Sequence, residues 1–274
     1  MATSIPLLET LSITLSSTGV AELAFNRPKK YNAMSALAYN DWLVAIKWAA
    51  RCEAVKVTVL TGRGKYYTSG QELQAPDLSP EGIALVKKRR AGVKELVDEM
   101  INFPKLLIAG VNGPAIGFGV TTLALCDVVY SVPEATFVTP FMKLSFCAEG
   151  CSSYLFPKIM GVSKANEMLL MGRTFSAQEL EVTGFISRLI PAERFHKDVL
   201  YLAEESAKYT SEAIKTTKKL IRDTDRDVLL KVNEVEMKML DECSSTQASI
   251  DSLNKFVREA NQRREAKLAK KSRL

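Results

Sequence analysis

The sequence predicts an α/β protein made of stacked β-β-α units that lead into a run of helices. Two observations predict this class: strand-like apolar segments alternate with helical patterns in the first half, and residues 152–264 are mostly helical in pattern. We expect a core over residues 1–200, a helical region over 201–264 and a basic tail over 265–274. The same periodicity also fits an ordinary doubly wound sheet.

The first elements follow from alternating apolar residues and a helix-capping signal. Residues 11–16 and 20–25 alternate around Gly19, which predicts a β-hairpin. Ser35 can accept a hydrogen bond from a helix N–H group, so we expect a helix from there to about residue 51.

The later elements are short apolar or β-branched runs separated by turns. They predict strands at 55–60, 106–111, 128–131 and 136–139. A helix is expected over about 82–102. Beyond residue 152 the helical pattern is interrupted at Gly161, Gly172, Gly184 and Pro191.

The net charge of +6 invites the hypothesis of a nucleic-acid or membrane-surface protein. Between Lys255 and Arg273, however, eight basic and two acidic residues account for the whole excess, and the preceding 254 residues are neutral overall. We therefore expect no nucleic-acid partner for the body of the protein.

Metal-site, secretion and membrane-insertion signals are weak. The five cysteines include no CxxC pair and His196 is the only histidine, so we expect no metal site and reduced thiols. The first ten residues lack the pattern of a signal peptide. Residues 106–126 carry no charge, but glycines and Pro114 interrupt them, so we expect no membrane insertion.

Two segments share one construction, a hydrophobic strand followed by a glycine-containing turn and an expected helix start. The turns are residues 68–73 and 112–119. Glycine lets a ligand approach the backbone, and a helix start leaves N–H donors unpaired. Two such donors could stabilise a carbonyl oxygen that becomes negative during a reaction, each by about 3–4 kcal/mol. Simple tight turns explain the pattern equally well, and neither turn matches a nucleotide-binding motif.

A set of motifs resembles the enoyl-CoA hydratase/isomerase (crotonase) superfamily. The superfamily motifs are Asn26-Arg27-Pro28, Asn32-Ala33, Tyr67-Thr68-Ser69-Gly70, Asn112-Gly113-Pro114-Ala115-Ile116-Gly117 and Cys126-Asp127. Later motifs are similar to those of peroxisomal Δ3,Δ2-enoyl-CoA isomerases and chromodomain-Y-like proteins: Pro140-Phe141, Glu149-Gly150-Cys151-Ser152-Ser153-Tyr154 and Phe156-Pro157-Lys158. The resemblance covers roughly residues 10–260 and implies a crotonase-like spiral of ββα units with a C-terminal helical trimerisation region.

The resemblance also implies an acyl-CoA site. The backbone N–H groups of Gln71 and Phe118 would form an oxyanion hole for the thioester. Residues of both turns would bind the substrate: Ser69, Gly70, Gln71, Glu72, Leu73, Gly117 and Phe118. Coenzyme A would be part of the substrate, and no separate cofactor is expected.

A single acidic group is expected to carry the chemistry. Hydratases of the superfamily use two carboxylates, whose positions hold Thr121 and Phe141 here, while Glu149 stands where the isomerases carry their catalytic Glu. We expect Glu149 to move a proton from C2 to C4 of a 3-enoyl-CoA in the β-oxidation of unsaturated fatty acids. The alternatives are a hydratase or isomerase of secondary metabolism, and a non-catalytic acyl-CoA-binding or corepressor module.

The final residues resemble a targeting signal. Ser272-Arg273-Leu274 is similar to the peroxisomal Ser-Lys-Leu tripeptide, which predicts a peroxisomal location and an import receptor as partner. The resemblance further implies a homotrimer or a dimer of trimers.

Overall fold

The computed structural model describes residues 4–271, without the side chains of 263, 264 and 266–271. The tripeptide Ser272-Arg273-Leu274 lies outside the described residues. Within them, no helix is long and apolar enough to cross a membrane. The same part of the chain holds no group of three or more His, Cys, Asp or Glu side chains placed to bind a metal ion.

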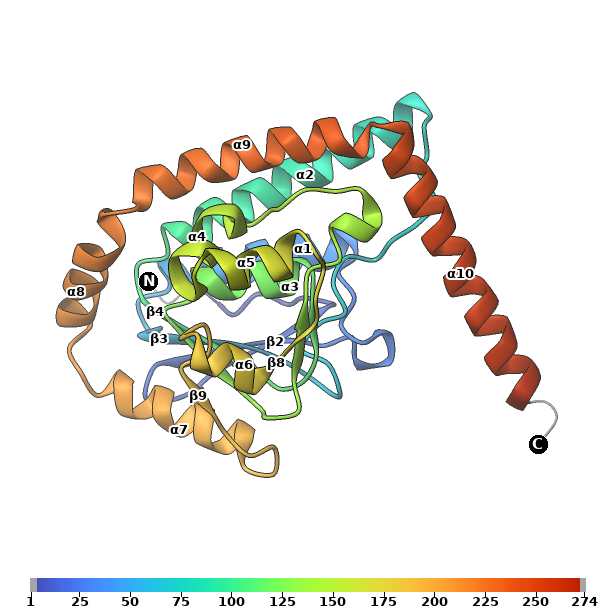
Figure 1. Cartoon of the computed structure of the whole chain (residues 1–274). Helices are drawn as coiled ribbons and strands as arrows, with labels where there is room; N and C mark the ends of the chain where they lie inside the picture. The colour runs from blue at the N-terminus through green and yellow to red at the C-terminus, as the bar shows by residue number, and fades with distance from the viewer. Residues whose placement is uncertain (1–3, 272–274) are drawn as a thin grey trace.

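A mixed sheet forms the centre of the described chain (Figure 1). In spatial order its strands are β1 (Leu11–Leu15), β2 (Val20–Phe25), β3 (Val57–Gly62), β4 (Leu106–Val111), β6 (Val128–Ser131) and β9 (Arg188–Leu189). The first pair is the predicted antiparallel hairpin, and every later pair is parallel. Strands β2 and β3 are buried at every residue, as expected for a sheet covered on both faces.

A smaller sheet begins in the turn after β4. It consists of β5 (Ala115–Ile116), β7 (Thr136–Val138) and β8 (Phe175–Ser176). Strands β5 and β7 are parallel, whereas β7 and β8 are antiparallel. Two-residue strands carry no periodicity, so only the middle strand of this sheet is predictable from the sequence.

Helices cover the main sheet. The α-helices are α1 (Ala36–Arg51), α2 (Pro80–Ile101), α3 (Phe118–Thr121), α4 (Ser152–Met160), α5 (Val162–Leu169), α6 (Ala177–Val182), α7 (Phe195–Ala207), α8 (Ser211–Asp223), α9 (Arg226–Ser244) and α10 (Gln247–Lys271). Short 3-10 turns are η1 (Pro28–Lys30), η2 (Thr122–Leu125) and η3 (Met142–Leu144). Helix α7 packs on β2, β3 and β4, while α1 packs on α2, and α9 runs alongside α2 (Figure 1).

Ser35 caps α1 as predicted, because its hydroxyl accepts a hydrogen bond from the N–H of Ala38. The helix buries Trp42 completely, with its ring edge-on to those of Phe25 and Phe118. These aromatic contacts pack β2, α1 and α3 against one another. Through Phe118 they also support the second glycine turn.

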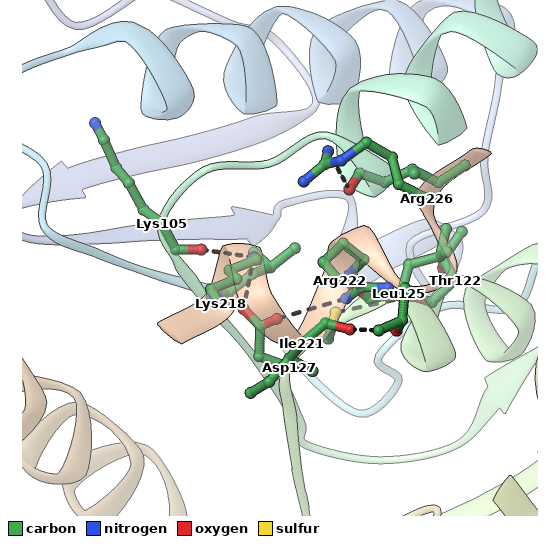
Figure 2. Close-up of polar contacts among 12 residues, drawn as sticks. Lys105, Thr122, Leu125, Asp127, Lys218, Ile221, Arg222 and Arg226 are labelled. Atoms are coloured by element: carbon green, nitrogen blue, oxygen red, sulfur yellow. Dashed lines mark hydrogen bonds and ion pairs between the residues drawn. The ribbon is translucent and has the colours of Figure 1, made fainter. Parts of the chain in front are cut away.

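Helix α8 is held to the core by ion pairs (Figure 2). Lys218 donates hydrogen bonds to Asp127 and to the carbonyl of Lys105, both at 2.7 Å. Arg222 contacts Asp127 at 3.5 Å and the carbonyl of Leu125 at 3.0 Å. None of the residues of α8 is buried, so charge contacts rather than apolar packing attach this helix. Asp127 therefore serves the attachment of the C-terminal helices.

Candidate active site

The first glycine turn runs in an extended conformation. The N–H of Met34 donates to the carbonyl of Gly70 at 2.9 Å, and Glu72 donates its N–H to the carbonyl of Met34 at 3.0 Å. These bonds are the two sides of a parallel bridge between Met34 and Gln71. In such a bridge the N–H of Gln71 points away from Met34. Among the described residues it meets no backbone acceptor, so it is available as a donor.

The prediction that a helix starts within residues 68–73 is wrong. The next helix, α2, begins at Pro80, where the Ser79 hydroxyl accepts a hydrogen bond from the N–H of Gly82 at 3.1 Å. The bridge to Met34 holds Gln71 extended, and Ser79-Pro80 supplies the real helix-start signal. The free N–H of Gln71 thus comes from strand-like pairing.

The second turn contains the predicted helix start. Gly117 has a φ of 60°, a conformation that favours glycine, and α3 begins directly after it at Phe118. The N–H of Gly117 donates to the carbonyl of Val138 at 2.8 Å. The N–H of Phe118, in the first turn of α3, has no acceptor within the helix. No other described backbone carbonyl accepts it.

The two turns lie against each other. Thr68 and Ala115 form a parallel bridge, in which the N–H of Ile116 donates to the carbonyl of Thr68 at 3.1 Å. A Cβ at Gly119 would lie 2.0 Å from the Thr68 methyl, and one at Gly70 would lie 2.8 Å from the Ile116 carbonyl oxygen. Both glycines are therefore needed for the close approach of the turn that contains Gln71 to the turn that contains Phe118.

The motif residues Arg27 and Asn32 hold the first turn in place. The Nδ2 group of Asn32 donates to the carbonyls of Arg63, Tyr66 and Tyr67, at 3.0, 2.8 and 3.2 Å. Arg27 donates to the carbonyl of Ala33 at 2.6 Å and pairs with Glu72 at 3.4 Å. These bonds give a structural role to two residues of the family motifs.

Glu149 lies in the loop between η3 and α4 and is half-buried. Burial raises the pKa of its carboxyl to about 7; Glu236 contributes further, while Arg90 and Arg89 oppose the increase. A carboxyl with a pKa near neutrality can exchange its proton easily at physiological pH.

Tyr39 connects Glu149 with the second turn. Its ring, on α1, is edge-on to that of Phe118 with centroids 5.4 Å apart. Burial raises the pKa of the Tyr39 hydroxyl, with a further contribution from the negative charge of Glu149. Tyr39 therefore remains neutral, and it contacts the second turn within range of the charge of Glu149.

Thr121 lies beside Gly150, the neighbour of Glu149. A Cβ at Gly150 would be 2.7 Å from the Thr121 hydroxyl oxygen, so the α3 helix and the Glu149 loop are in direct contact. That hydroxyl already donates to the carbonyl of Phe118 at 3.1 Å. The position at which the superfamily's hydratases place a carboxylate thus lies next to Glu149, but it holds a group that is neither charged nor free.

Four apolar side chains of α3 and of the segment before Glu149 are mostly buried. Phe118, Phe141 and Leu144 are each less than 9% exposed, and Phe146 is half-buried. These side chains come from α3 and from the segment around η3, which leads to Glu149. Burial is the largest contribution to the raised pKa of Glu149.

The predicted substrate-binding residues divide into two groups. Gly70, Gly117 and Phe118 are buried within the paired turns, whereas Ser69, Gln71, Glu72 and Leu73 are half-buried. The N–H of Ser69 donates to the carbonyl of Tyr31 at 2.9 Å, so its backbone serves the turn itself.

Four residues near Glu149 were missed by sequence reasoning: Tyr39, Arg89, Arg90 and Glu236. Tyr39 has a weak signal, because it lies on the apolar face of a capped helix. The two arginines belong to a basic run on α2 that reads as a solvated surface. Glu236 lies on α9, far along the chain from Glu149, and no local pattern distinguishes it from the other acidic residues of that helix.

The fold and the paired turns define a crotonase-like α/β protein. A solved structure of an enoyl-CoA hydratase/isomerase from Pseudoalteromonas atlantica T6c superposes with a TM-score of 0.82, at 25% identity over 92% of this chain and 98% of that one. The profile described as enoyl-CoA hydratase/isomerase matches residues 16–265. The chain belongs to the enoyl-CoA hydratase/isomerase family.

Two relatives are similar over most of the chain. Enoyl-CoA delta isomerase 2 of Homo sapiens is 42% identical over 245 residues, which are 86% of this chain and 62% of the human protein. Peroxisomal enoyl-CoA delta isomerase 3 of Mus musculus is 40% identical over 225 residues, which are 82% of this chain and 71% of the mouse protein. The chain thus spans less than two thirds of the human relative's length.

Proposed function

We propose that the protein is a Δ3,Δ2-enoyl-CoA isomerase, which converts a 3-enoyl-CoA to trans-2-enoyl-CoA in fatty-acid β-oxidation. The observation that carries this proposal is one half-buried carboxyl of raised pKa, Glu149, whose loop contacts the helix that follows the second of two turns with free N–H donors. The names of the human and mouse relatives support the same reaction.

The proposed mechanism moves one proton. The ionised carboxylate of Glu149 removes a proton from C2, and the electron pair forms an enolate on the thioester oxygen. The N–H groups of Gln71 and Phe118 stabilise that oxygen as an oxyanion hole. Glu149, now protonated, returns the proton to C4, and the double bond shifts to C2–C3. The reaction requires only proton transfer, so no separate cofactor takes part. Coenzyme A enters as part of the substrate.

The surroundings of Glu149 favour isomerisation over hydration. Adding water needs a second acid–base group, and Thr121 and Phe141 occupy the two positions that would supply one in a hydratase. The apolar side chains around the site also exclude water from the enolate.

The decisive experiment compares Glu149→Gln with the wild-type protein on cis- and trans-3-enoyl-CoA substrates of several chain lengths. We expect the variant to bind acyl-CoA normally but to lose nearly all isomerisation, because an amide cannot accept the C2 proton. Glu134→Gln, at an exposed glutamate, is the matched control and should be fully active. Full activity of Glu149→Gln, or water addition without isomerisation in the wild type, would overturn the assignment.

We also propose a peroxisomal location, supported by the mouse relative's name and by the sequence Ser272-Arg273-Leu274. An import receptor would read this tripeptide. Deleting the three residues should leave a fluorescent fusion in the cytosol; unchanged peroxisomal import would contradict their role.

The family resemblance further leads us to propose assembly as a homotrimer or a dimer of trimers. Sedimentation of the purified protein tests this proposal, and a purely monomeric species would exclude it.

A further inference from the structure

A buried carboxylate on α9 binds the backbone next to Glu149. Glu236 is only 5% exposed, and its two oxygens accept hydrogen bonds from the N–H groups of Cys151 at 2.6 Å and Ser153 at 2.9 Å. These donors lie at the N-terminus of α4, which begins at Ser152, three residues after Glu149. Bonds from backbone N–H groups to a carboxylate are among the stronger hydrogen bonds in proteins.

The turn that these bonds hold has an unfavourable backbone. Gly150 and Cys151 have φ values of 65° and 62°, so two consecutive residues are left-handed, and one of them is not glycine. Cys151 occupies the N-cap position of α4 but its side chain makes no capping hydrogen bond. Locally, the hydroxyl of Ser152 donates a hydrogen bond to the carbonyl of Glu149 at 2.7 Å. Two contacts with α9 anchor this turn further: the Cys151 thiol donates to the carbonyl of Leu229 at 3.4 Å, and Glu236 accepts the two backbone N–H bonds.

We propose that Glu236 is a positioning residue for Glu149: it fixes the strained turn that presents the catalytic carboxylate and places a second negative charge beside it. This inference rests on the proposed function of Glu149. It assigns to α9 a role in the reaction as well as in the fold.

Several charged or titratable side chains surround Glu149 and Glu236. Glu149 faces Arg89 and Arg90 from α2, Tyr39 from α1 and Cys147 from its own loop. Glu236 also faces the thiols of Cys147 and Cys151. Arg90 is drawn toward α9 by its ion pair with Asp241.

These neighbours have opposing effects on the Glu149 carboxyl. The two arginines lower its pKa, whereas Glu236 raises it. Removing the charge of Glu236 therefore leaves only burial to oppose the arginines, which lowers the pKa of Glu149 and makes it a weaker base.

The test uses Glu236→Gln, Glu236→Asp and, as matched control, Glu234→Gln on the same helix, where Glu234 forms a surface pair with Lys231. The readouts are kcat, KM and the pH dependence of kcat/KM. For Glu236→Gln we expect kcat to fall about tenfold with KM changed less than about twofold, and the acid limb to move down by about 0.5–1 pH unit.

Glu236→Asp keeps the charge on a shorter side chain, so its acid limb should remain close to that of the wild type while kcat is reduced. Glu234→Gln should match the wild type in every readout. A wild-type kcat and pH profile in Glu236→Gln would overturn the proposal. If Glu236→Gln does not fold, Glu236→Asp decides, since wild-type kcat in that variant would also overturn it.

The outcome for Glu149 is separate. If Glu149→Gln is inactive while both Glu236 variants behave like the wild type, only the positioning role fails. If Glu149→Gln stays active, the proposed function itself fails.

Discussion

Replacing Gly119 with alanine should separate the two turns that form the candidate oxyanion hole. The new Cβ would lie 2.0 Å from the Thr68 methyl carbon, whereas ordinary contact requires 3.4 Å or more. Thr68 is fully buried, and its hydroxyl donates to the Asn32 carbonyl at 2.7 Å and accepts the Gly70 N–H at 3.1 Å. Rotating Thr68 away would break both bonds, so the turns themselves must move apart by more than about 1 Å.

The expected cost has two parts. Overpacking of this kind destabilises a protein by about 1–3 kcal/mol. A displacement of about 1 Å at a reacting centre lowers the rate by about 100-fold. Isomerisation of a 3-enoyl-CoA, followed by the absorbance of the conjugated product, measures the second effect, and urea unfolding measures the first.

A second substitution, Thr68→Ser, tests whether the clash with the methyl group causes the loss of activity. Thr68→Ser removes the clashing methyl group but keeps the hydroxyl, and the nearest remaining Thr68 atom is Cβ, at 3.5 Å. The double variant should therefore recover most of the activity. Gly92→Ala on α2, where a Cβ meets nothing within 4 Å, is the control and should stay fully active. Wild-type activity of Gly119→Ala alone, or no recovery in the double variant, would refute the argument.

Three further predictions concern charged groups. Because Glu149 must be ionised to accept a proton and its pKa is about 7, kcat/KM should rise with pH through that value, and a flat profile between about pH 5 and 9 would contradict this. The folded-state pKa lies above the ordinary 4.5, so ionisation costs stability at high pH; Glu149→Gln should resist urea better than the wild type at about pH 8 and equally at about pH 4. Asp127→Ala leaves Lys218, with a side chain only 10% exposed, without its carboxylate partner, and should lower the free energy of unfolding by about 2 kcal/mol. Asp223→Ala, in a more exposed pair with Arg226, should cost less than about 1 kcal/mol, and equal losses would argue against the anchoring role of Asp127.

The sequence predicts the elements that are specified by neighbouring residues. The hairpin around Gly19, the helix capped by Ser35 and the strand β4 are confirmed, because alternation, capping and apolar runs are local signals. The paired glycine turns were also visible as motifs. The extended path of Gln71 was not, since it depends on a bridge to Met34 in another segment.

The same limit applies to the site. Glu149 was recognisable because its motif is contiguous, and it remains the proposed proton carrier. Glu236 contacts Cys151 and Ser153 across more than eighty positions of the chain, so nothing near it in the sequence indicates its partners. Residues that act through tertiary contacts require the structure.

Helix α8 is attached by ion pairs, whereas the core is held by apolar packing. These two kinds of interaction respond differently to dissolved salt. Added salt screens charge contacts, although less where the side chains are mostly buried, as in Lys218 and Arg222, while sulfate-like salts strengthen apolar packing in the core. Helix α8 leads directly into α9, which carries Glu236 to the turn beside Glu149 (Figure 1). Salt concentration should therefore affect the attachment of the C-terminal helices before it affects the apolar packing of the sheet.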